Sequence, residues 1–223
     1  MTFHIDGPSD GPLFLFTHGA GAPSNSDFMQ TIAQGLAEQG ICVVRFNFDY
    51  MEIRLATGSR RPPERAPKLI AQFEQKIKAL GEQKKRPMVI GGKSMGGRMA
   101  SLVASLSDEH NNDENNSDDN QLVKIKGVAC LGFPFHPSGK VDKLRVDHFP
   151  KVKQKQLIIQ GTRDKLGSFE EVESYQLSNN IEFLWLEDGD HDLKPRVKSG
   201  FTHQYHLQKA INHLATFIKE TLS

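Results

Sequence analysis

Six short apolar runs, separated by longer segments with helical spacing, constrain the fold of this chain most strongly. The predicted strands are Leu13–His18, Cys42–Phe48, Met88–Gly92, Lys126–Phe133, Gln156–Gly161 and Ile181–Glu187. Several of them are apolar at successive positions, as is typical of strands covered on both faces. Strands that alternate with helices predict an α/β fold, a three-layer sandwich in which helices cover a mostly parallel sheet of about six strands.

Four segments between and after these strands have the spacing of amphipathic helices. They are Ser26–Gln39, Pro67–Leu80, Gly96–Leu106 and His203–Leu222. The last places Ile211, Leu214 and Ile218 on one stripe, and Gly40 ends the first as a C-terminal glycine does. With 223 residues and no internal repeat, the chain is predicted to form a single domain over 1–223.

Two segments have no such pattern. Residues 107–121 are acidic, rich in asparagine and without apolar side chains, which predicts a mobile, solvated loop, with an acidic metal or partner site as the alternative. Ala56–Pro67 is rich in arginine and proline, and we expect it to be irregular.

Composition excludes several classes of protein. The net charge is +1 and no basic stripe with interleaved aromatic residues is present, so no nucleic-acid partner is expected. The apolar runs are too short to span a bilayer, and the first residues lack a signal-peptide pattern, so no membrane partner is expected. Cys42 and Cys130 both fall in predicted strands, which favours core packing over a disulfide and indicates a cytoplasmic protein. No glycine-rich phosphate loop is present and no cofactor is expected.

The sequence Gly92-Lys93-Ser94-Met95-Gly96 joins a predicted strand to a predicted helix. A serine on such a sharp turn presents its hydroxyl above the sheet, and the glycines two residues away let strand and helix approach closely. The five-residue pattern alone is weak, but its position between strand and helix indicates that Ser94 is a nucleophile rather than an idle turn serine.

A serine nucleophile needs a base and a carboxylate that orients the base. Asp164 follows the strand that ends at Gly161, and His191 follows the strand that ends at Glu187. Because the carboxyl ends of parallel strands share one edge of the sheet, we expect both side chains beside Ser94. The alternatives are that Asp164 only caps a turn, or that Asp190 or Asp192 orients the histidine.

The tetrahedral intermediate of acyl transfer requires backbone N–H groups that stabilise its oxyanion. Met95, directly after the nucleophile, is one predicted donor. The loop Thr17–Asn25 should supply the other, and Ala20 is the predicted donor.

Together these residues resemble the α/β-hydrolase superfamily, and within it the compact branch that includes dienelactone-hydrolase-like proteins. Further segments resemble a small group related to testis-expressed protein 30 and to the hydrolase-like subunit of a histone acetyltransferase complex. These segments are Thr17–Gly21, Arg45–Met51, Gly91–Ala100 and Gly132–Lys140. The resemblance extends from Leu13 to the final helix and implies the fold, but no particular substrate.

The chain departs from fuller members of that superfamily in three respects. Little sequence precedes Leu13, which is why six strands are expected rather than eight. The segment Phe133–Lys155, where relatives insert a lid, is short, so a lipase is disfavoured. The nucleophile is serine where dienelactone hydrolases of the usual kind have cysteine, which puts that specific activity in doubt.

The favoured function is therefore hydrolysis of a carboxylic ester or related small acyl compound through an acyl-enzyme on Ser94. A thioesterase or small-peptide hydrolase would use the same groups, and a binding or scaffold protein without turnover is the alternative. Asp188–Asp192 resembles a calcium loop only in part, because Leu193 stands where glycine is required. The sequence leaves the oligomeric state open.

Five further residues are candidates for substrate binding: Gly21, Tyr50, Arg61, Lys93 and His136. The favoured interpretation of Arg54, Arg60, Arg61, Arg65 and Lys93 is a solvated basic loop. The alternative is that they place positive charge beside the cleft and favour an anionic substrate.

Overall fold

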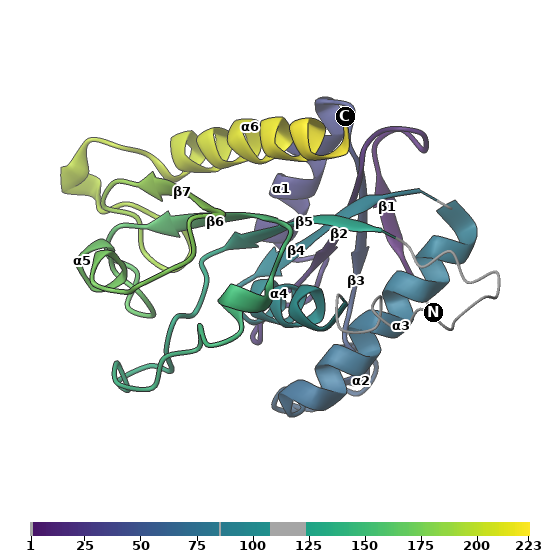
Figure 1. The fold of residues 1–223 in the computed structure, drawn as a ribbon, viewed down its shortest axis with the longest axis horizontal. Coiled ribbons are helices and arrows are strands. Elements are labelled where there is room, and N and C mark those ends of the chain that lie inside the picture. The colour runs from purple at the N-terminus through teal and green to yellow at the C-terminus, as the bar shows by residue number, and fades with distance from the viewer. Residues whose placement is uncertain (1, 85, 108–123) are drawn as a thin grey trace.

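The computed structural model describes residues 2–84, 86–107 and 124–223 (Figure 1). Within them, a seven-stranded sheet runs in the order β1-β3-β2-β4-β5-β6-β7. The strands are β1 His4–Asp6, β2 Leu13–Thr17, β3 Cys42–Phe46, β4 Met88–Lys93, β5 Ile125–Leu131, β6 Lys155–Gly161 and β7 Ile181–Leu186. All neighbouring strands are parallel except β1, which pairs antiparallel with β3.

Helices cover both faces of this sheet (Figure 1). On one face lie α1 (Asp27–Glu38) and α6 (His203–Leu222), which pack against each other. On the other lie α2 (Asp49–Thr57), α3 (Ala66–Lys84) and α4 (Met95–Ser107). Successive residues of β2 point to opposite faces of the sheet. Phe14 packs on the face covered by α1 and α6, and Leu15 on the face covered by α2, α3 and α4. The burial of every β2 residue explains its continuous apolar sequence.

The predicted α/β architecture is confirmed, and each of the six expected strands occurs within two residues of its predicted ends. The predicted strand number was too low by one, because β1 was missed. This strand is three residues long, its side chains are exposed or half-buried, and its sequence, His-Ile-Asp, has no apolar pattern. Its pairing with β3, with Ile5 opposite Val44, could not be inferred from composition.

Two helices were also missed. Only Tyr50 and Met51 of α2 are buried, so this helix has no regular apolar stripe. It includes the first two residues of the segment Ala56–Pro67 that was expected to be irregular, and α3 begins at Ala66. The short helix α5 (Phe169–Glu173) begins with a capping box, in which Ser168 and Glu171 exchange side chain-to-backbone hydrogen bonds.

The sheet reverses its winding direction between β2 and β4. From this point β3 lies on one side, while β5, β6 and β7 follow on the other. The carboxyl ends of β2 and β4 are therefore adjacent, with the loop after Thr17 beside the turn after Lys93. In open α/β sheets, ligands bind at such a switch point.

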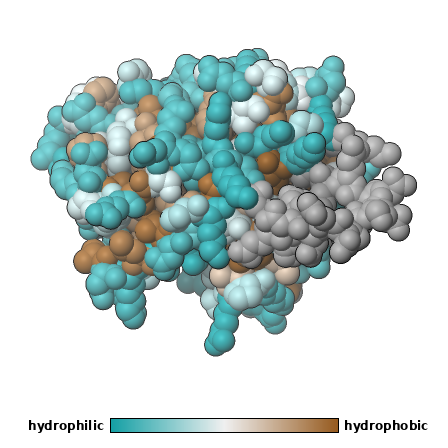
Figure 2. All heavy atoms as spheres, in the orientation of Figure 1, coloured by the Kyte–Doolittle hydropathy of each residue, from teal (hydrophilic) through white to brown (hydrophobic). Residues whose placement is uncertain are grey.

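Three remaining expectations concern loops, cysteines and surface. Residues 108–121 of the predicted mobile loop lie outside the described residues, and Ser107 ends α4. Cys42 and Cys130 are buried and free, as predicted. The segment Phe133–Lys155 contains one 3-10 turn, Phe149–Lys151. The surface in Figure 2 is mainly hydrophilic, and no described helix is long and apolar enough to cross a membrane.

Arg45 ties the edge strand β1 to the body of the sheet. Its guanidinium contacts the Asp6 carboxylate at 2.9 Å and also donates to the Ser24 carbonyl, with only 7% of the side chain exposed. We expect Arg45→Met to lower the free energy of unfolding by about 3 kcal/mol, because it leaves Asp6 partly buried without its partner.

Urea denaturation measures this change. The control is His213→Gln, which breaks the exposed ion pair of His213 with Glu182 and should cost no more than about 1 kcal/mol. Equal effects of the two substitutions would contradict a structural role of the Arg45–Asp6 pair.

Candidate active site

Ser94 lies between β4 and α4 in a left-handed backbone conformation, with φ of 52°. The two flanking glycines permit this turn. A Cβ atom on Gly92 would lie 2.5 Å from the Gly96 carbonyl carbon, and one on Gly96 would lie 2.6 Å from the His18 carbonyl oxygen. Since real Cβ atoms do not approach backbone so closely, both positions require glycine. The turn has the geometry expected of a nucleophile elbow.

The side chains of Ser94, His191 and Asp164 form a hydrogen-bonded chain. The Ser94 Oγ lies 2.8 Å from His191 Nε2, and His191 Nδ1 lies 2.8 Å from Asp164 Oδ2. The Asp164 carboxylate is fully buried, while the His191 side chain is 29% exposed. Three residues that are distant in sequence thus meet at the carboxyl edge of the sheet, where the sequence predicted them.

Asp164 is held by more than the histidine. Its Oδ1 accepts a hydrogen bond from the Leu166 amide at 2.8 Å, so it also closes the turn that follows β6. The buried amide of Gln160 lies 2.9 Å from Asp164 Oδ2, and Gln160 also pairs with the backbone of Phe133. Gln160 was not recognised as a site residue, although a glutamine near the end of an otherwise apolar strand was the available signal.

The aspartates around His191 have other partners. Asp188 pairs with Arg196 and Arg163, which lower its pKa to about 2. Asp190 accepts the amides of Asp192 and Lys194 and so stabilises the turn. The ring nitrogen of His191 is bonded by Asp164 rather than by either flanking aspartate.

Lys93 positions the loop that carries His191. Its ammonium donates to the His191 carbonyl at 2.6 Å and lies 3.2 Å from Asp192, over the ring of Phe28. The side chain is 9% exposed, and burial lowers the pKa of its amine while Asp192 opposes that shift. The residue next to Ser94 therefore fastens the backbone of His191.

The loop after β2 is fixed by two buried rings. His18 Nδ1 donates to the Gly19 carbonyl at 2.6 Å, and its Nε2 accepts the Phe48 amide at 3.1 Å. Burial lowers the pKa of His18 to about 4, so the ring is neutral at pH 7 and serves as donor and acceptor at once. The Tyr50 hydroxyl lies 3.1 Å from the Ala20 carbonyl oxygen. His18 was not singled out from the sequence, where nine histidines compete.

A cavity of about 330 Å³ lies beside the Ser94 hydroxyl. Its lining consists of Ala20, Glu64, Ala66, Leu69, Ser94, Met95, Arg98, Met99, Pro134, Arg145 and Leu166. Both predicted oxyanion donors, Ala20 and Met95, are at this cavity, and Met95 is the first residue of α4, where amides have no partner within the helix. A more open depression of about 580 Å³ borders Asp164 but includes neither Ser94 nor His191.

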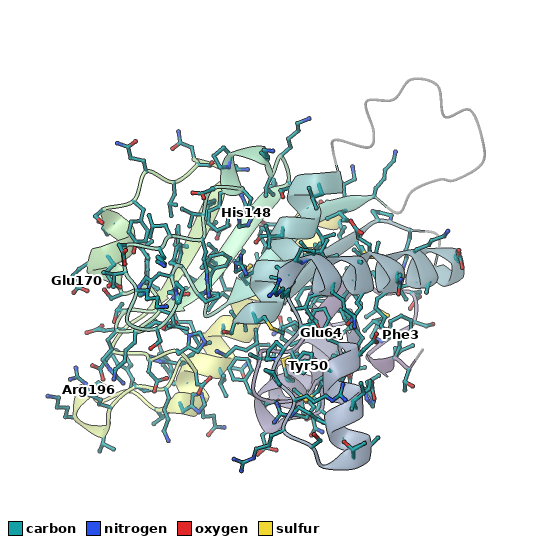
Figure 3. All side chains as sticks on the ribbon, turned by 90° about the horizontal axis from the view of Figure 1, so that it is seen from below. Phe3, Tyr50, Glu64, His148, Glu170 and Arg196 are labelled. Atoms are coloured by element: carbon teal, nitrogen blue, oxygen red, sulfur yellow. The ribbon has the colours of Figure 1, made fainter. Side chains whose placement is uncertain are left out.

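The five predicted substrate-binding residues do not line this cavity. Tyr50 is buried and holds the Ala20 loop, and Lys93 holds the His191 loop (Figure 3 labels Tyr50). His136 is buried beside Glu171, at 3.5 Å. Gly21 and Arg61 are exposed.

The positive charge at the cavity comes from residues other than the basic loop and Lys93. Arg54, Arg60, Arg61, Arg65 and Lys93 are absent from the cavity wall. The arginines that line it are Arg98 and Arg145, which the sequence did not mark because they lie outside the basic loop.

Comparison with known proteins agrees with the fold. The family model described as an alpha/beta hydrolase domain matches residues 10–219. Similar solved structures include a dienelactone hydrolase from Anabaena variabilis, with TM-score 0.69 and 17% identity over 99% of this chain and 92% of that one. The esterase domain of a Rhodothermus marinus protein has a TM-score of 0.66 and 18% identity over 98% of this chain and 92% of that one. A Xanthomonas campestris serine hydrolase described as lacking a lid has a TM-score of 0.65 and 17% identity over 95% of this chain and 86% of that one.

These structural likenesses concern the fold. The family match covers nearly the whole chain, and this protein therefore belongs to the alpha/beta hydrolase domain family. The resemblance to the α/β-hydrolase superfamily inferred from the sequence is confirmed.

The contact of Lys93 with His191 leads to a prediction. Lys93→Met keeps most of the side-chain volume but removes the donor to the His191 carbonyl, so His191 should lose its alignment with Ser94. We expect the rate at which a fluorophosphonate probe labels Ser94 to fall by about 10- to 100-fold, because misplacement of a reacting group by about 1 Å has effects of this size.

The control is Asp192→Asn, which removes the exposed charge beside Lys93 but leaves the bond to the His191 carbonyl intact. Its labelling rate should stay within about threefold of wild type. Unchanged labelling of Lys93→Met would contradict a positioning role.

Proposed function

We propose that this protein is a serine hydrolase that cleaves a small carboxylic ester or related acyl compound through an acyl-enzyme on Ser94. The observation that carries the proposal is the pair of 2.8 Å hydrogen bonds that link Ser94 to His191 and His191 to Asp164. A neutral imidazole in this arrangement can accept the hydroxyl proton as the oxygen attacks.

In the proposed reaction, Ser94 Oγ attacks the substrate carbonyl while His191 Nε2 takes its proton. The C–O bond to the leaving group then breaks, and His191 returns the proton to the departing oxygen. Water attacks the acyl-enzyme with His191 again as the base, which releases the acid and restores the serine. Apart from the substrate, every group that these reaction steps need comes from the chain or from water.

Two further features support this chemistry. The amides of Ala20 and Met95 are the proposed donors to the oxyanion, and each such donor contributes several kcal/mol, on the order of 3, to the stability of the transition state. Asp164 would fix the tautomer of His191, with its Nδ1–H toward the carboxylate, and would stabilise the imidazolium that forms.

The cavity favours a small substrate. Its volume of about 330 Å³ lies at the lower end of ligand pockets, and the short segment Phe133–Lys155 adds little apolar cover. Esters rank first because two similar structures are named as an esterase domain and a dienelactone hydrolase. Thioesters and activated amides could react through the same groups.

Substitution of the triad residues tests the proposal. Ser94→Ala should abolish hydrolysis of short-chain esters and fluorophosphonate labelling, because the nucleophile is lost. Asp164→Asn should lower kcat by about 10³- to 10⁴-fold, because it favours the wrong tautomer of the histidine. Both are measured on a panel of esters of increasing acyl length.

Ser101→Ala is the matched control. Ser101 also has a histidine partner, His148 at 2.7 Å, but its hydroxyl donates to the Arg98 carbonyl and it is fully buried. Its loss should leave labelling intact. Equal residual activity in wild type and Ser94→Ala would reject catalysis by Ser94 and favour a binding or scaffold protein of this fold.

A further inference from the structure

Two arginines share the cavity with Ser94. Arg98 follows Ser94 by one helical turn, and its amide donates to the Ser94 carbonyl at 3.0 Å. Arg145 belongs to the segment between β5 and β6, where its amide donates to the Phe135 carbonyl at 2.8 Å. Arg98 lies in the first turn of α4, directly after the turn that carries Ser94, and both residues line the same cavity. Both arginines line the cavity.

Neither guanidinium has an acid partner within the described ranges 2–84, 86–107 and 124–223. The ion pairs found there include neither arginine, and the buried Nε of Arg98 has no acceptor. Burial, together with the nearby charge of Arg145, lowers the pKa of Arg98. Since an arginine in a protein remains protonated, two like charges meet in a partly buried place.

The neighbouring polar groups do not neutralise these charges. Glu64 also lines the cavity, but one of its oxygens pairs with Lys68 at 2.6 Å and the other accepts from Gln72 at 2.8 Å (Figure 3 labels Glu64). His148 lies close enough to Arg98 for their charges to interact, and burial lowers its pKa to about 4, which leaves it neutral at pH 7.

We propose that Arg98 and Arg145 bind a carboxylate carried by the acyl part of the substrate, so that the preferred substrates are short half-esters of dicarboxylic acids. This inference rests on the proposed function and names its substrate class. A guanidinium pairs with a carboxylate through two parallel hydrogen bonds, and partial burial strengthens that pairing. Arg98 and Ser94 line one cavity of about 330 Å³, which suits a short chain between the carboxylate and the reacting carbonyl.

The apolar part of the wall fits the rest of such a substrate. Leu69, Met99 and Leu166 also line the cavity. They offer a surface for a few methylene groups, and the small volume favours a short acyl chain.

The experiment compares two esters that share one leaving group. Monobenzyl succinate carries the terminal carboxylate, and benzyl valerate is its neutral counterpart, with release of benzyl alcohol followed by chromatography. In wild type we expect kcat/KM for monobenzyl succinate to be at least about 10-fold higher. Arg98→Gln and Arg145→Gln should each lower this value by about 10- to 100-fold, mainly through KM, with benzyl valerate changed by less than about threefold.

Two controls accompany these variants. Lys143→Gln removes an exposed cation from the same segment as Arg145 and should leave kcat/KM for both esters unchanged. Arg98→Lys keeps the charge but loses the two parallel hydrogen bonds of a guanidinium. Its kcat/KM for monobenzyl succinate should lie between those of wild type and Arg98→Gln. Turnover of the neutral ester reports that each variant is folded. If the ratio of kcat/KM for the two esters is the same in both glutamine variants as in wild type, the proposal is overturned.

A further arm distinguishes carboxylate from phosphate. Succinate and inorganic phosphate are compared as competitive inhibitors of benzyl valerate hydrolysis. Stronger inhibition by succinate, lost in the glutamine variants, supports the carboxylate site. Stronger inhibition by phosphate overturns that assignment.

A binding measurement separates failure of this inference from failure of the proposed function. Calorimetry of Ser94→Ala with monobenzyl succinate reports the anion site without turnover. If monobenzyl succinate binds only when both arginines are present, but wild type hydrolyses neither ester, the anion site is supported and the proposed hydrolase function fails. Ser94-dependent hydrolysis of benzyl valerate without any preference for succinate leaves the function standing and overturns the anion site.

Discussion

The left-handed backbone of Ser94 is the constraint on which the arrangement of the site depends. For a residue with a side chain this conformation costs on the order of 1–2 kcal/mol, and the surrounding backbone must offset that cost. Here β4 enters the turn from the centre of the sheet, α4 leaves it, and Gly92 and Gly96 permit contacts that no side chain would tolerate. The Ser94 amide is also fixed to the Leu131 carbonyl of β5 at 2.9 Å. The Ser94 backbone is therefore held in the conformation from which its hydroxyl contacts His191.

Buried polar side chains near the carboxyl ends of the strands position the groups around Ser94. His18 fixes the loop that carries Ala20, Gln160 contacts the Asp164 carboxylate, and Lys93 anchors the His191 carbonyl. All three residues are buried, and in a partly dry environment such hydrogen bonds are strong and their loss is costly. The chemistry proposed for the site depends on these supports as much as on the three residues that would take part in it.

Sequence reasoning found the elements with strong local signals. The β4 turn was visible because glycines flank Ser94 in a fixed pattern, and Asp164 and His191 were visible because each directly follows an apolar strand. By contrast, β1 and α2 lack apolar periodicity, and their formation depends on tertiary contacts such as Arg45 with Asp6.

The cavity walls were beyond the reach of local patterns. Arg145 belongs to a segment without regular structure, and only folding brings it to the same space as Arg98. Conversely, Tyr50 and Lys93 looked like substrate contacts because of their chemistry, but the structure commits both to backbone carbonyls.

The tether between Lys93 and the His191 carbonyl has a dynamic consequence. Since Lys93 precedes Ser94 in the chain, His191 is fastened to the same short piece of backbone that carries the hydroxyl. Thermal fluctuation that displaces the end of β4 carries both groups in the same direction, and the gap between oxygen and imidazole is preserved. The separation on which the proposed proton transfer depends is thus set by the end of β4 itself.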